Sequence, residues 1–401
     1  RSSARLQRNV SHVTFAQRLA ATREEMAAET RKEGRRRASG GASRHPGKGS
    51  IAMRRLLRAS GITAAVLLLS CALAAAAGLS VERKKVNAAG KSFAVTVIRV
   101  PREGYRVKVG LANGRVGSTA SLASIAQSHG AVAAINGCFF SAYTKDAIKP
   151  PWHHVITEGQ LVHHGQTGTT LGFDAQGNYR MERLKIRITG TVGADQERPH
   201  NWYAYRVNFP PGASGAILFN RFWAGAKTPA GGKQAVIQNG VVRSVGSGGL
   251  PIPRDGYALS FIGGDAHLGN RFQPGDQVTL RIEYGSHDEE FWQSVQEGLG
   301  CGPRLLAEGR IAYDPKGEGF NDPKILSLAG ARSAIGIRHD GTILLVTCSA
   351  TVRQLADIMK ALGAYDAMNL DGGASSGLWV QGKYLVQPGR SISNALLILK
   401  K

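Results

Sequence analysis

The sequence lacks the short motifs that mark several large enzyme classes. Among its 401 residues there is no His-Glu-x-x-His zinc motif and no glycine-rich P-loop ending in Lys and a hydroxyl residue. The commonest zinc peptidase and nucleoside triphosphatase functions are therefore excluded on motif grounds. No segment of about 20–50 residues repeats along the chain, so a solenoid fold is not expected.

Cysteine is scarce and is not arranged as a set of metal ligands. Cys71, Cys138, Cys301 and Cys348 form no Cys-x-x-Cys pair, so a thiolate zinc site is not expected. Four histidines fall within residues 153–164, but they come as two adjacent pairs, and neighbours on a strand point to opposite faces. We therefore predict no metal site and no cofactor, and a structural divalent ion stays open.

Acidic residues are also few, at 28 Asp and Glu against 51 Lys and Arg, which gives a formal net charge of +23. Residues 1–60 alone hold 15 basic and 4 acidic residues. That segment has the composition of a disordered tail, and no recognisable nucleic-acid-binding module follows it. We therefore expect no nucleic-acid partner. The milder positive charge of the remaining chain suits an anionic substrate.

Residues 53–80 have the pattern of a signal peptide or membrane anchor. A basic start precedes the uncharged, mostly apolar run 61–79, which ends in an alanine-rich cleavage site. If it is not cleaved, that run is the only expected membrane contact. Met53 is a candidate start, and residues 1–52 are then an upstream reading frame or a basic disordered tail. The working part, residues 81–401, is expected to be periplasmic, secreted or membrane-anchored facing outside the cytoplasm.

Glycine, by contrast, is abundant, and the most informative glycines follow a helix and a strand near the C-terminus. Residues 351–362 carry apolar side chains at helical spacing, with a capping box at the start and Gly363 at the end. A buried strand over residues 364–370 then ends in Asp371-Gly372-Gly373. Alternation places Asn369 and Asp371 on one side, where two polar groups need partners or a ligand. An ordinary Asp-Gly-Gly turn is the alternative.

Strand-like segments dominate the rest of the chain. Residues 131–135 form a buried strand, and Asp340-Gly341 turns residues 331–337 back into residues 342–348 as a hairpin. We expect a second glycine loop at residues 298–303 and a packed loop excursion over residues 195–230. The predicted fold class is α+β, with a large mixed β-sheet, few helices and a single catalytic domain.

The glycine loops lie near a small set of polar residues: Asp371, Asn136, Asn369, Asn394, Arg332 and Arg390. Backbone N–H groups together with arginine form a natural cradle for phosphate. A carboxylate beside such a cradle can act as nucleophile, general acid or general base toward a glycosidic carbon. For Arg332, which lies inside a predicted strand, a solvated surface position is the alternative.

Four motifs in this order resemble the signature of the phosphodiester glycosidase family, over roughly residues 85–401. They are Ile135-Asn136-Gly137-Cys138-Phe139-Phe140, Gly300-Cys301-Gly302-Pro303-Arg304-Leu305, Ala331-Arg332-Ser333-Ala334-Ile335-Gly336 and Asn369-Leu370-Asp371-Gly372-Gly373-Ala374-Ser375-Ser376. Bacterial members of this family are often described as exopolysaccharide biosynthesis proteins. The resemblance implies a mixed α/β fold and a hydrolase that cleaves a sugar-phosphate diester at the anomeric C1–O bond, in envelope or extracellular glycans.

The resemblance also implies roles for individual residues. Asp371 is expected at the anomeric centre, with Asn369 and Arg332 as the other catalytic residues. The substrate-binding residues are then Asn136, Gly137, Phe139, Phe140, Gly300, Gly302, Ser333, Gly372, Gly373, Ser375, Ser376 and Asn394. Arg332 and the amides of the two glycine loops are expected to hold the phosphate.

One departure from the family pattern bears on the two glycine loops, and one rival function stays open. Cys138 stands where the family usually has Gly, and the resemblance brings its loop close to that of Cys301. A Cys138–Cys301 disulfide is one outcome, and free buried thiols or a pairing with Cys348 are the others. The rival function is a non-catalytic envelope protein that binds anionic polysaccharide. Either way, the expected partner is an anionic glycan or a sugar-phosphate.

Overall fold

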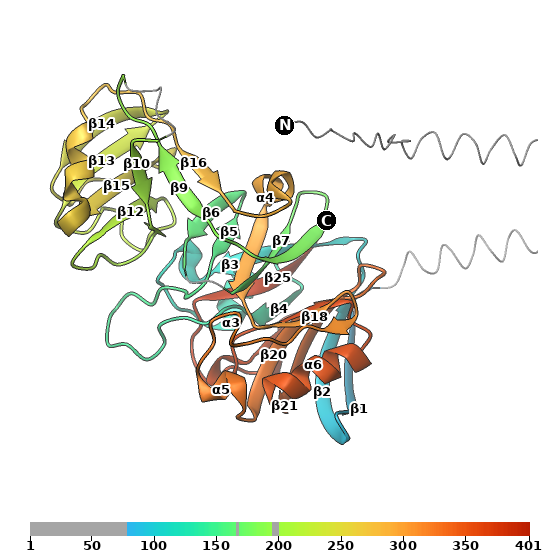
Figure 1. Ribbon diagram of the computed structural model, residues 1–401. Coiled ribbons are helices and arrows are strands. Elements are labelled where there is room, and N and C mark those ends of the chain that lie inside the picture. Colours follow the sequence, from blue (N-terminus) through green and yellow to red (C-terminus); the bar gives the residue numbers. More distant parts are fainter. Residues whose placement is uncertain (1–77, 166–167, 195–199) are drawn as a thin grey trace, which may run out of the picture. The chain divides into compact units, whose positions relative to one another are not determined.

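The computed structural model describes residues 78–165, 168–194 and 200–401 of the chain (Figure 1). The predicted tail and nearly all of the predicted signal segment lie outside these residues. Within the described ranges, no helix is long and apolar enough to cross a membrane.

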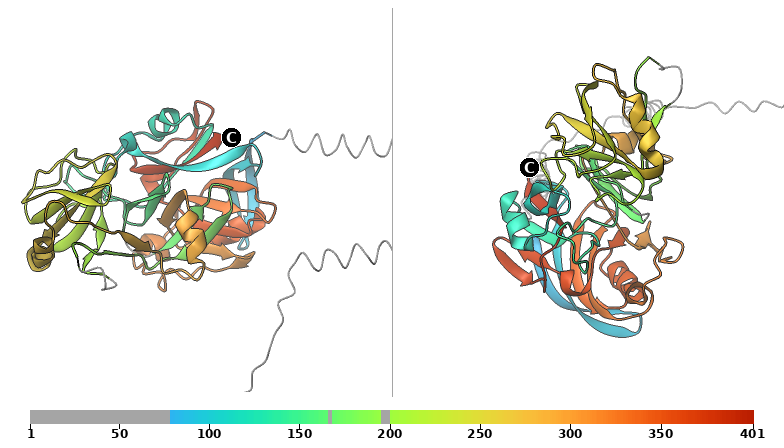
Figure 2. Two further views of the ribbon diagram at one scale, coloured as in Figure 1. Left: turned by 90° about the horizontal axis from the view of Figure 1, so that it is seen from above. Right: turned by 90° about the vertical axis from the view of Figure 1, so that its left-hand side faces the viewer.

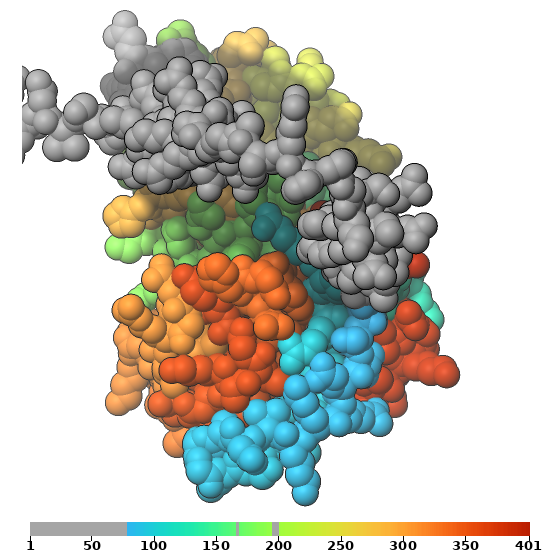
Figure 3. All heavy atoms as spheres, turned by 90° about the vertical axis from the view of Figure 1, so that its right-hand side faces the viewer, coloured from blue at the N-terminus to red at the C-terminus, as the bar shows by residue number. Residues whose placement is uncertain are grey.

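A seven-stranded sheet carries the strand that leads to Asp371. Its strands, in spatial order, are β1 (Ser80–Ala88), β2 (Lys91–Val100), β21 (Ile343–Ala350), β20 (Gly330–Ile337), β22 (Asp366–Asn369), β18 (Arg304–Ala307) and β19 (Arg310–Ile311). Neighbouring strands are antiparallel throughout. The predicted hairpin is confirmed as β20 and β21. In Figure 3, the first strands (blue) lie beside C-terminal segments (orange to red), as the pairing of β2 with β21 requires.

Helix α6 (Val352–Ala361) lies just before the strand that leads to Asp371, as the sequence predicts. Thr351 and Gln354 form a reciprocal capping box, and Gly363 adopts a φ of +82° at the C-terminal end. The apolar face of α6 is buried in a cluster shared with β2, β20, β21 and β22. The packing of α6 therefore holds the part of the sheet that leads into the Asp371 loop.

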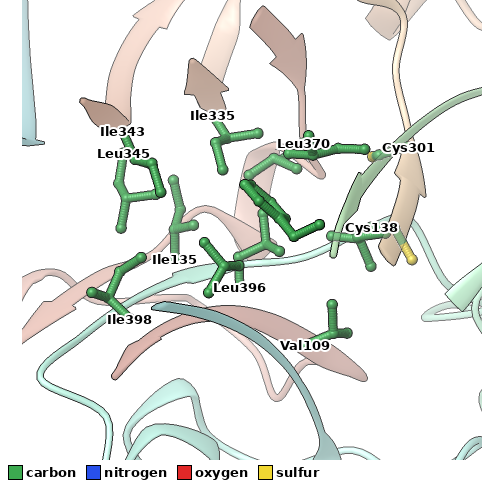
Figure 4. Close-up of a cluster of buried hydrophobic side chains, with 14 of the residues drawn as sticks. Val109, Ile135, Cys138, Cys301, Ile335, Ile343, Leu345, Leu370, Leu396 and Ile398 are labelled. Carbon is green, nitrogen blue, oxygen red and sulfur yellow. The ribbon is translucent and has the colours of Figure 1, made fainter. Parts of the chain in front are cut away.

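Two five-stranded sheets share a core with the seven-stranded sheet (Figure 4). One has the order β24 (Lys383–Val386), β23 (Leu378–Val380), β4 (Ala133–Asn136), β25 (Asn394–Lys400) and β3 (Tyr105–Leu111), and α3 (Leu122–Ser128) packs on it. The other has the order β6 (Gln160–His163), β5 (Val155–Thr157), β17 (Glu297–Cys301), β7 (Thr169–Phe173) and β8 (Tyr179–Arg183). Ile335, Leu396 and Leu299 each come from a different one of these three sheets, and all are buried.

The middle of the chain builds a second set of sheets around its own core (Figures 1 and 2). One sheet has the order β11 (Arg206–Val207), β12 (Gly215–Asn220), β15 (Gly256–Ile262), β13 (Lys233–Gln238) and β14 (Val241–Gly246). The other has the order β10 (Trp202–Ala204), β9 (Arg187–Gly190) and β16 (Arg281–Glu283). The prediction of a loop excursion over residues 195–230 is therefore wrong for the strand residues 202–204, 206–207 and 215–220, and residues 195–199 lie outside the described residues. Aromatic residues there, such as Trp202 and Phe219, are buried strand residues rather than loop packing.

The predicted α+β class with few helices is confirmed. Besides α3 and α6, the described residues contain the short helices α4 (Glu289–Ser294) and α5 (Pro323–Leu326). The strands are spread over several sheets, and a parallel pair occurs between β11 and β12.

Candidate active site

A cleft of about 620 Å³ opens at the glycine loop that follows β22. It is lined by residues from 139–153, 318–332 and 371–375, and by Arg390. Hollows of comparable size lie elsewhere, but this one holds the predicted carboxylate. The predicted site residues that line it are Asp371, Gly372, Gly373, Ser375, Arg332, Phe139 and Phe140. The predicted residues that do not line it are Asn369, Asn136, Gly137, Gly300, Gly302, Ser333, Ser376 and Asn394.

Asp371 is a partly buried carboxylate with an unusual pKa. Burial raises the pKa of Asp371 to about 6, while hydrogen bonds from Ser375 and the Gly372 N–H and the charge of Arg390 oppose the rise. The Gly372 N–H donates to Oδ1 over 2.8 Å. The group therefore changes charge in a pH range where an acid–base or nucleophilic role is accessible.

The backbone on each side of Asp371 is held by residues from other strands. The Asn136 Nδ2 donates to the Asp371 carbonyl over 2.7 Å, and the Asp371 N–H donates to the Gly137 carbonyl over 3.0 Å. The Asn136 Oδ1 accepts from the Ser333 hydroxyl at 2.7 Å and from the Gly377 N–H at 3.0 Å. Asn136 and Ser333 are fully buried, so they position the loop and do not reach the cleft.

The position of Gly137, just after β4, leaves no space for a side chain beside β25. A Cβ at this position would lie 1.9 Å from the Asn394 Oδ1, a distance that forces movement. The Asn394 side chain is engaged by the same loop, because its Oδ1 accepts from the Cys138 N–H and its Nδ2 lies 3.3 Å from the Cys138 Sγ. Asn394 therefore holds the loop that holds Asp371.

Of the outcomes left open for Cys138 and Cys301, the structure has the free buried thiols and not the disulfide. Both residues are free thiols inside the core shown in Figure 4. Burial raises the pKa of Cys138 to about 12 and that of Cys301 well above its usual value. Thiols held in the neutral form are poor nucleophiles, and here they pack as small apolar groups.

The predicted second glycine loop is mostly a strand, and its amides are already bonded. Gly300 lies within β17, and its N–H donates to the His154 carbonyl over 2.7 Å. The Gly302 N–H donates to the Asn369 carbonyl over 3.0 Å. Neither amide is available to a phosphate, because each already donates to a backbone carbonyl. Sequence alone did not show that the glycines at 298–302 make room for neighbouring strands.

Arg332 lines the cleft but presents only part of its guanidinium. Its Nε donates to the Ala350 carbonyl over 3.0 Å, and its Nη2 donates to the carbonyls of Lys324 and Leu328. The Nε and Nη2 of the arginine that was expected to hold phosphate therefore face backbone carbonyls. Its Nη1, which has no partner among the described residues, lies near Gly372, where a Cβ would be 3.3 Å away. Only the N–H groups of Nη1 are left to donate to a ligand.

Asn369 and Ser376 are buried on the inner side of the loop rather than in the cleft. The Asn369 Nδ2 donates to the Gly302 carbonyl over 2.9 Å. The Asn369 Oδ1 and the Ser376 hydroxyl are buried without a partner in the part of the chain that the structure describes. Asn369 thus ties the Asp371 strand to the turn after β17.

Glu318 is a second cleft carboxylate that the sequence reasoning missed. Its Oε2 accepts from the N–H and hydroxyl of Thr169 at 3.0 and 2.7 Å, and its Oε1 accepts from the Arg304 N–H at 2.7 Å. Burial raises the pKa of Glu318, and the hydrogen bonds from Thr169 oppose this. With both oxygens engaged, Glu318 is placed to join three chain segments. The sequence offered one signal for this residue: Glu318 stands between Gly317 and Gly319, and Asp371 is likewise a carboxylate beside glycines.

Aromatic rings form one wall of the cleft. Phe139 contacts Trp152, His153 and Phe320 at ring-centroid distances of 6.2, 5.8 and 6.0 Å. His153 stacks on Phe320, and burial lowers the pKa of His153 to about 4, so its ring is neutral near neutral pH. Apolar ring faces beside a carboxylate suit the faces of a sugar ring.

The histidine pairs do not form a metal site in the structure. Among the residues described, no group of three or more His, Cys, Asp or Glu side chains is arranged to hold a metal ion. His154 instead stacks on His164 at 5.1 Å, and His163 stacks on Phe209 at 5.9 Å.

Residues 231–399 match the family model described as phosphodiester glycosidase. The resemblance predicted from the sequence motifs is confirmed over this range. It contains the three motifs at residues 300–305, 331–336 and 369–376, and the motif at residues 135–140 lies before it. An uncharacterised protein of Rickettsia conorii is 26% identical over 241 residues, which cover 57% of this chain and 79% of that protein.

Two solved structures are similar to this chain over most of its length. A hypothetical protein from Synechocystis gives a TM-score of 0.70 at 26% identity, over 81% of this chain and 62% of that one. The chain thus spans about three fifths of the Synechocystis protein. A Burkholderia pseudomallei protein described as exported gives a TM-score of 0.62 at 20% identity, over 77% of this chain and 74% of that one, and shows the shared fold.

Proposed function

We propose that this protein is a hydrolase that cleaves a sugar-phosphate diester at the anomeric C1–O bond, in envelope or extracellular glycans. The observation that carries the proposal is Asp371, which lies in a cleft with its pKa raised to about 6 and belongs to the residues that match the phosphodiester glycosidase family model. A raised carboxylate pKa in a cleft favours a chemical role over a surface role.

The proposed phosphate contacts come from groups at or beside the cleft that lack partners among the described residues. The N–H groups of Gly373 and Ala374 donate no hydrogen bond to any described residue, and Gly373 lines the cleft. Together with the Nη1 of Arg332, they provide donors beside Asp371. The aromatic wall at Phe139 and Phe320 would take the sugar.

In the proposed reaction, the bond between C1 and the phosphate-side oxygen breaks. The electron pair leaves with that oxygen as a phosphate monoester, and the oxygen of a water molecule becomes bonded to C1. The proton that this water loses passes to the monoester or to solvent. Because a phosphate monoester is already a good leaving group, strong acid catalysis matters less than stabilising positive charge at C1. The ionised Asp371 would supply this, as nucleophile or as electrostatic stabiliser. Asn136, Ser333 and Glu318 would position the groups that act.

The proposed partner is an anionic glycan or sugar-phosphate, and the proposed location is outside the cytoplasm. The basic and apolar pattern of residues 53–80 supports this location. Sequencing the N-terminus of protein recovered from the native host's envelope and medium tests it, since a start just after the apolar run is expected.

The activity is tested with the purified full chain and a panel of sugar-1-phosphodiesters carrying methyl or p-nitrophenyl aglycones. We expect equal amounts of free reducing sugar and phosphate monoester. The Asp371→Asn variant, at the same concentration, is the control for contaminating hydrolases. No turnover with any sugar, together with retained binding to an anionic polysaccharide, would overturn the proposal in favour of a non-catalytic glycan-binding protein.

A further inference from the structure

Tyr143 is an exposed aromatic residue on the lining of the candidate active-site cleft. Its exposure is 78%, and it belongs to the same lining as Asp371. An exposed ring of this kind gains nothing from burial in the core, and the lining contains a second exposed ring at Trp152, so the two form an aromatic surface that a ligand can cover.

Two cations flank the Tyr143 ring. The guanidinium carbon of Arg390 lies 4.5 Å from the ring centroid, and the Lys324 Nζ lies 5.6 Å from it. The Arg390 Nη2 also donates to the Tyr143 hydroxyl over 2.6 Å. Neither cation forms an ion pair with a carboxylate anywhere in the described ranges. Their positive charge is therefore free to meet an anion.

Trp152 adds a second exposed ring to the same cleft. It is 46% exposed, its Nε1 donates to the Ser141 hydroxyl over 3.3 Å, and its ring contacts Phe139 at 6.2 Å. Because Phe139 belongs to the inner aromatic wall, the rings lead from the interior of the cleft to its exposed edge. Aromatic faces with a nearby hydrogen-bonding edge suit successive sugar rings.

The carboxylates that line the cleft accept hydrogen bonds from other groups and form no salt bridge with Lys324 or Arg390 among the described residues. The Asp322 Oδ1 accepts from the Lys324 N–H at the start of α5, and the oxygens of Glu318 accept from Thr169 and Arg304. Asp371 is within the electrostatic reach of Arg390, which opposes the rise of its pKa. Arg390 thus interacts with the reacting carboxylate as well as with the exposed ring.

We propose that Tyr143, Trp152, Lys324 and Arg390 form an outer subsite that binds a sugar bearing an anionic group, one repeat away from the bond that is cleaved. The ligand is then a glycan chain with recurring negative charge rather than an isolated sugar-phosphate diester. This inference rests on the proposed function for its position relative to the cleaved bond. The anionic group is a phosphate or a carboxylate, since both match the same cations.

The test compares substrates of different length and charge on the full chain. A single-repeat sugar-1-phosphodiester is compared with three-repeat chains of equal length that carry phosphate, uronic acid or no charge in the outer repeats. We expect kcat/KM to be about tenfold higher for a charged chain than for the single repeat, and the neutral chain to give a smaller gain. Which charged chain is preferred identifies the anion.

Variants separate the ring from the cations. Tyr143→Ala and Lys324→Ala are expected to remove most of the preference for charged chains, and raised salt should weaken the preference in the wild type. Tyr143→Phe keeps the ring and loses the hydroxyl bonded to Arg390, so it should keep part of the preference. Tyr205→Ala is the matched control, because Tyr205 is 52% exposed and does not line this cleft.

Binding to the Asp371→Asn variant, followed by tryptophan fluorescence, distinguishes failure of the subsite from failure of the proposed function. Turnover with no preference for charged chains, or an equal loss on all substrates in Tyr143→Ala, overturns the outer subsite alone. Binding of charged chains that depends on Tyr143, without turnover by the wild type, supports the subsite and overturns the hydrolase proposal.

Discussion

Asp371 differs from a surface carboxylate in its pKa and in its neighbours. The carboxylate of an aspartate in a turn normally accepts hydrogen bonds from nearby backbone N–H groups, and Asp371 does accept from the Gly372 N–H. Burial nevertheless raises its pKa to about 6, since the few donors around it compensate incompletely. The strand and glycines that place this carboxylate were predictable from sequence, but the degree of its desolvation depends on walls contributed by residues 139–153 and 318–332.

Asp371→Asn tests the role of the charge with little change in shape. We expect kcat to fall by about 10²–10⁴-fold on sugar-1-phosphodiesters, because the amide cannot stabilise positive charge at C1. The thermal unfolding midpoint should stay close to that of the wild type or rise slightly, since a costly buried charge is removed. A variant with near wild-type turnover would remove Asp371 from the mechanism.

The pH profile tests which protonation state of Asp371 is active. If the carboxylate is the working form, kcat/KM rises with pH and levels off above the pKa of about 6. Steady-state rates measured from pH 4 to 8 at constant ionic strength give this curve. Any residual activity of Asp371→Asn should lack the rise of kcat/KM between pH 4 and 6. Activity that instead falls as pH rises through 6 would assign Asp371 as a general acid.

At the scale of single elements, backbone pairing decides what sequence patterns leave open. The capping box of α6 and the β20–β21 hairpin were predictable, because short-range spacing determines both. The status of Gly300 was not, because a glycine-rich segment is typical of a loop and also of a strand that packs closely on its neighbours. Arg332 was placed correctly in a strand. Which of its nitrogens meet carbonyls depends on how α5 packs beside β20, and the Asp322-Pro323 start of that helix does not specify this packing.

The junction of β4, β25 and the Asp371 loop provides an element-scale test. Gly137→Ala should lower the free energy of unfolding by about 1–3 kcal/mol, because the new Cβ would overlap the Asn394 side chain. Activity should fall as well, since the Gly137 carbonyl accepts from the Asp371 N–H. Urea unfolding and turnover are measured together.

Gly212→Ala is the control for the Gly137 substitution, because its nearest contact would be an ordinary 3.8 Å from the Ser214 carbonyl. Its unfolding midpoint and its activity should stay near those of the wild type. If Gly137→Ala also keeps the wild-type midpoint and activity, the Asn394 side chain moves aside at little cost and the expected overlap does not destabilise the junction.

At the scale of the whole molecule, buried histidines link stability to pH. Burial lowers the pKa of His153 and His164 to about 4 and that of His163 to about 3, and lowers the pKa of His154 well below its usual range. The unfolded chain binds protons at these groups below about pH 6.5, while the folded chain does not. Their contribution to stability is therefore present above pH 6.5 and is lost as pH falls toward 4.

Asp371 acts in the opposite direction, because its folded pKa of about 6 lies above the ordinary value of 3.8. It favours the folded state most below pH 3.8, and this advantage is lost as pH rises through 6. Between pH 7 and pH 4, the stability lost because four buried histidines resist protonation exceeds the stability gained from Asp371. We therefore expect the net stability of the fold to decrease between pH 7 and pH 4.

His163→Phe tests this linkage. The substitution keeps a ring on Phe209 but removes the titratable nitrogens, so the loss of unfolding free energy between pH 7 and pH 4 should shrink by about 3 kcal/mol. The measurement is the urea midpoint at several pH values, and the change with pH is compared rather than the absolute stability, so a packing penalty from the larger ring cancels. His287→Gln, at an exposed position, should keep the wild-type dependence. Equal pH dependence in all three proteins would show that His163 is protonated as readily in the folded chain as in the unfolded one.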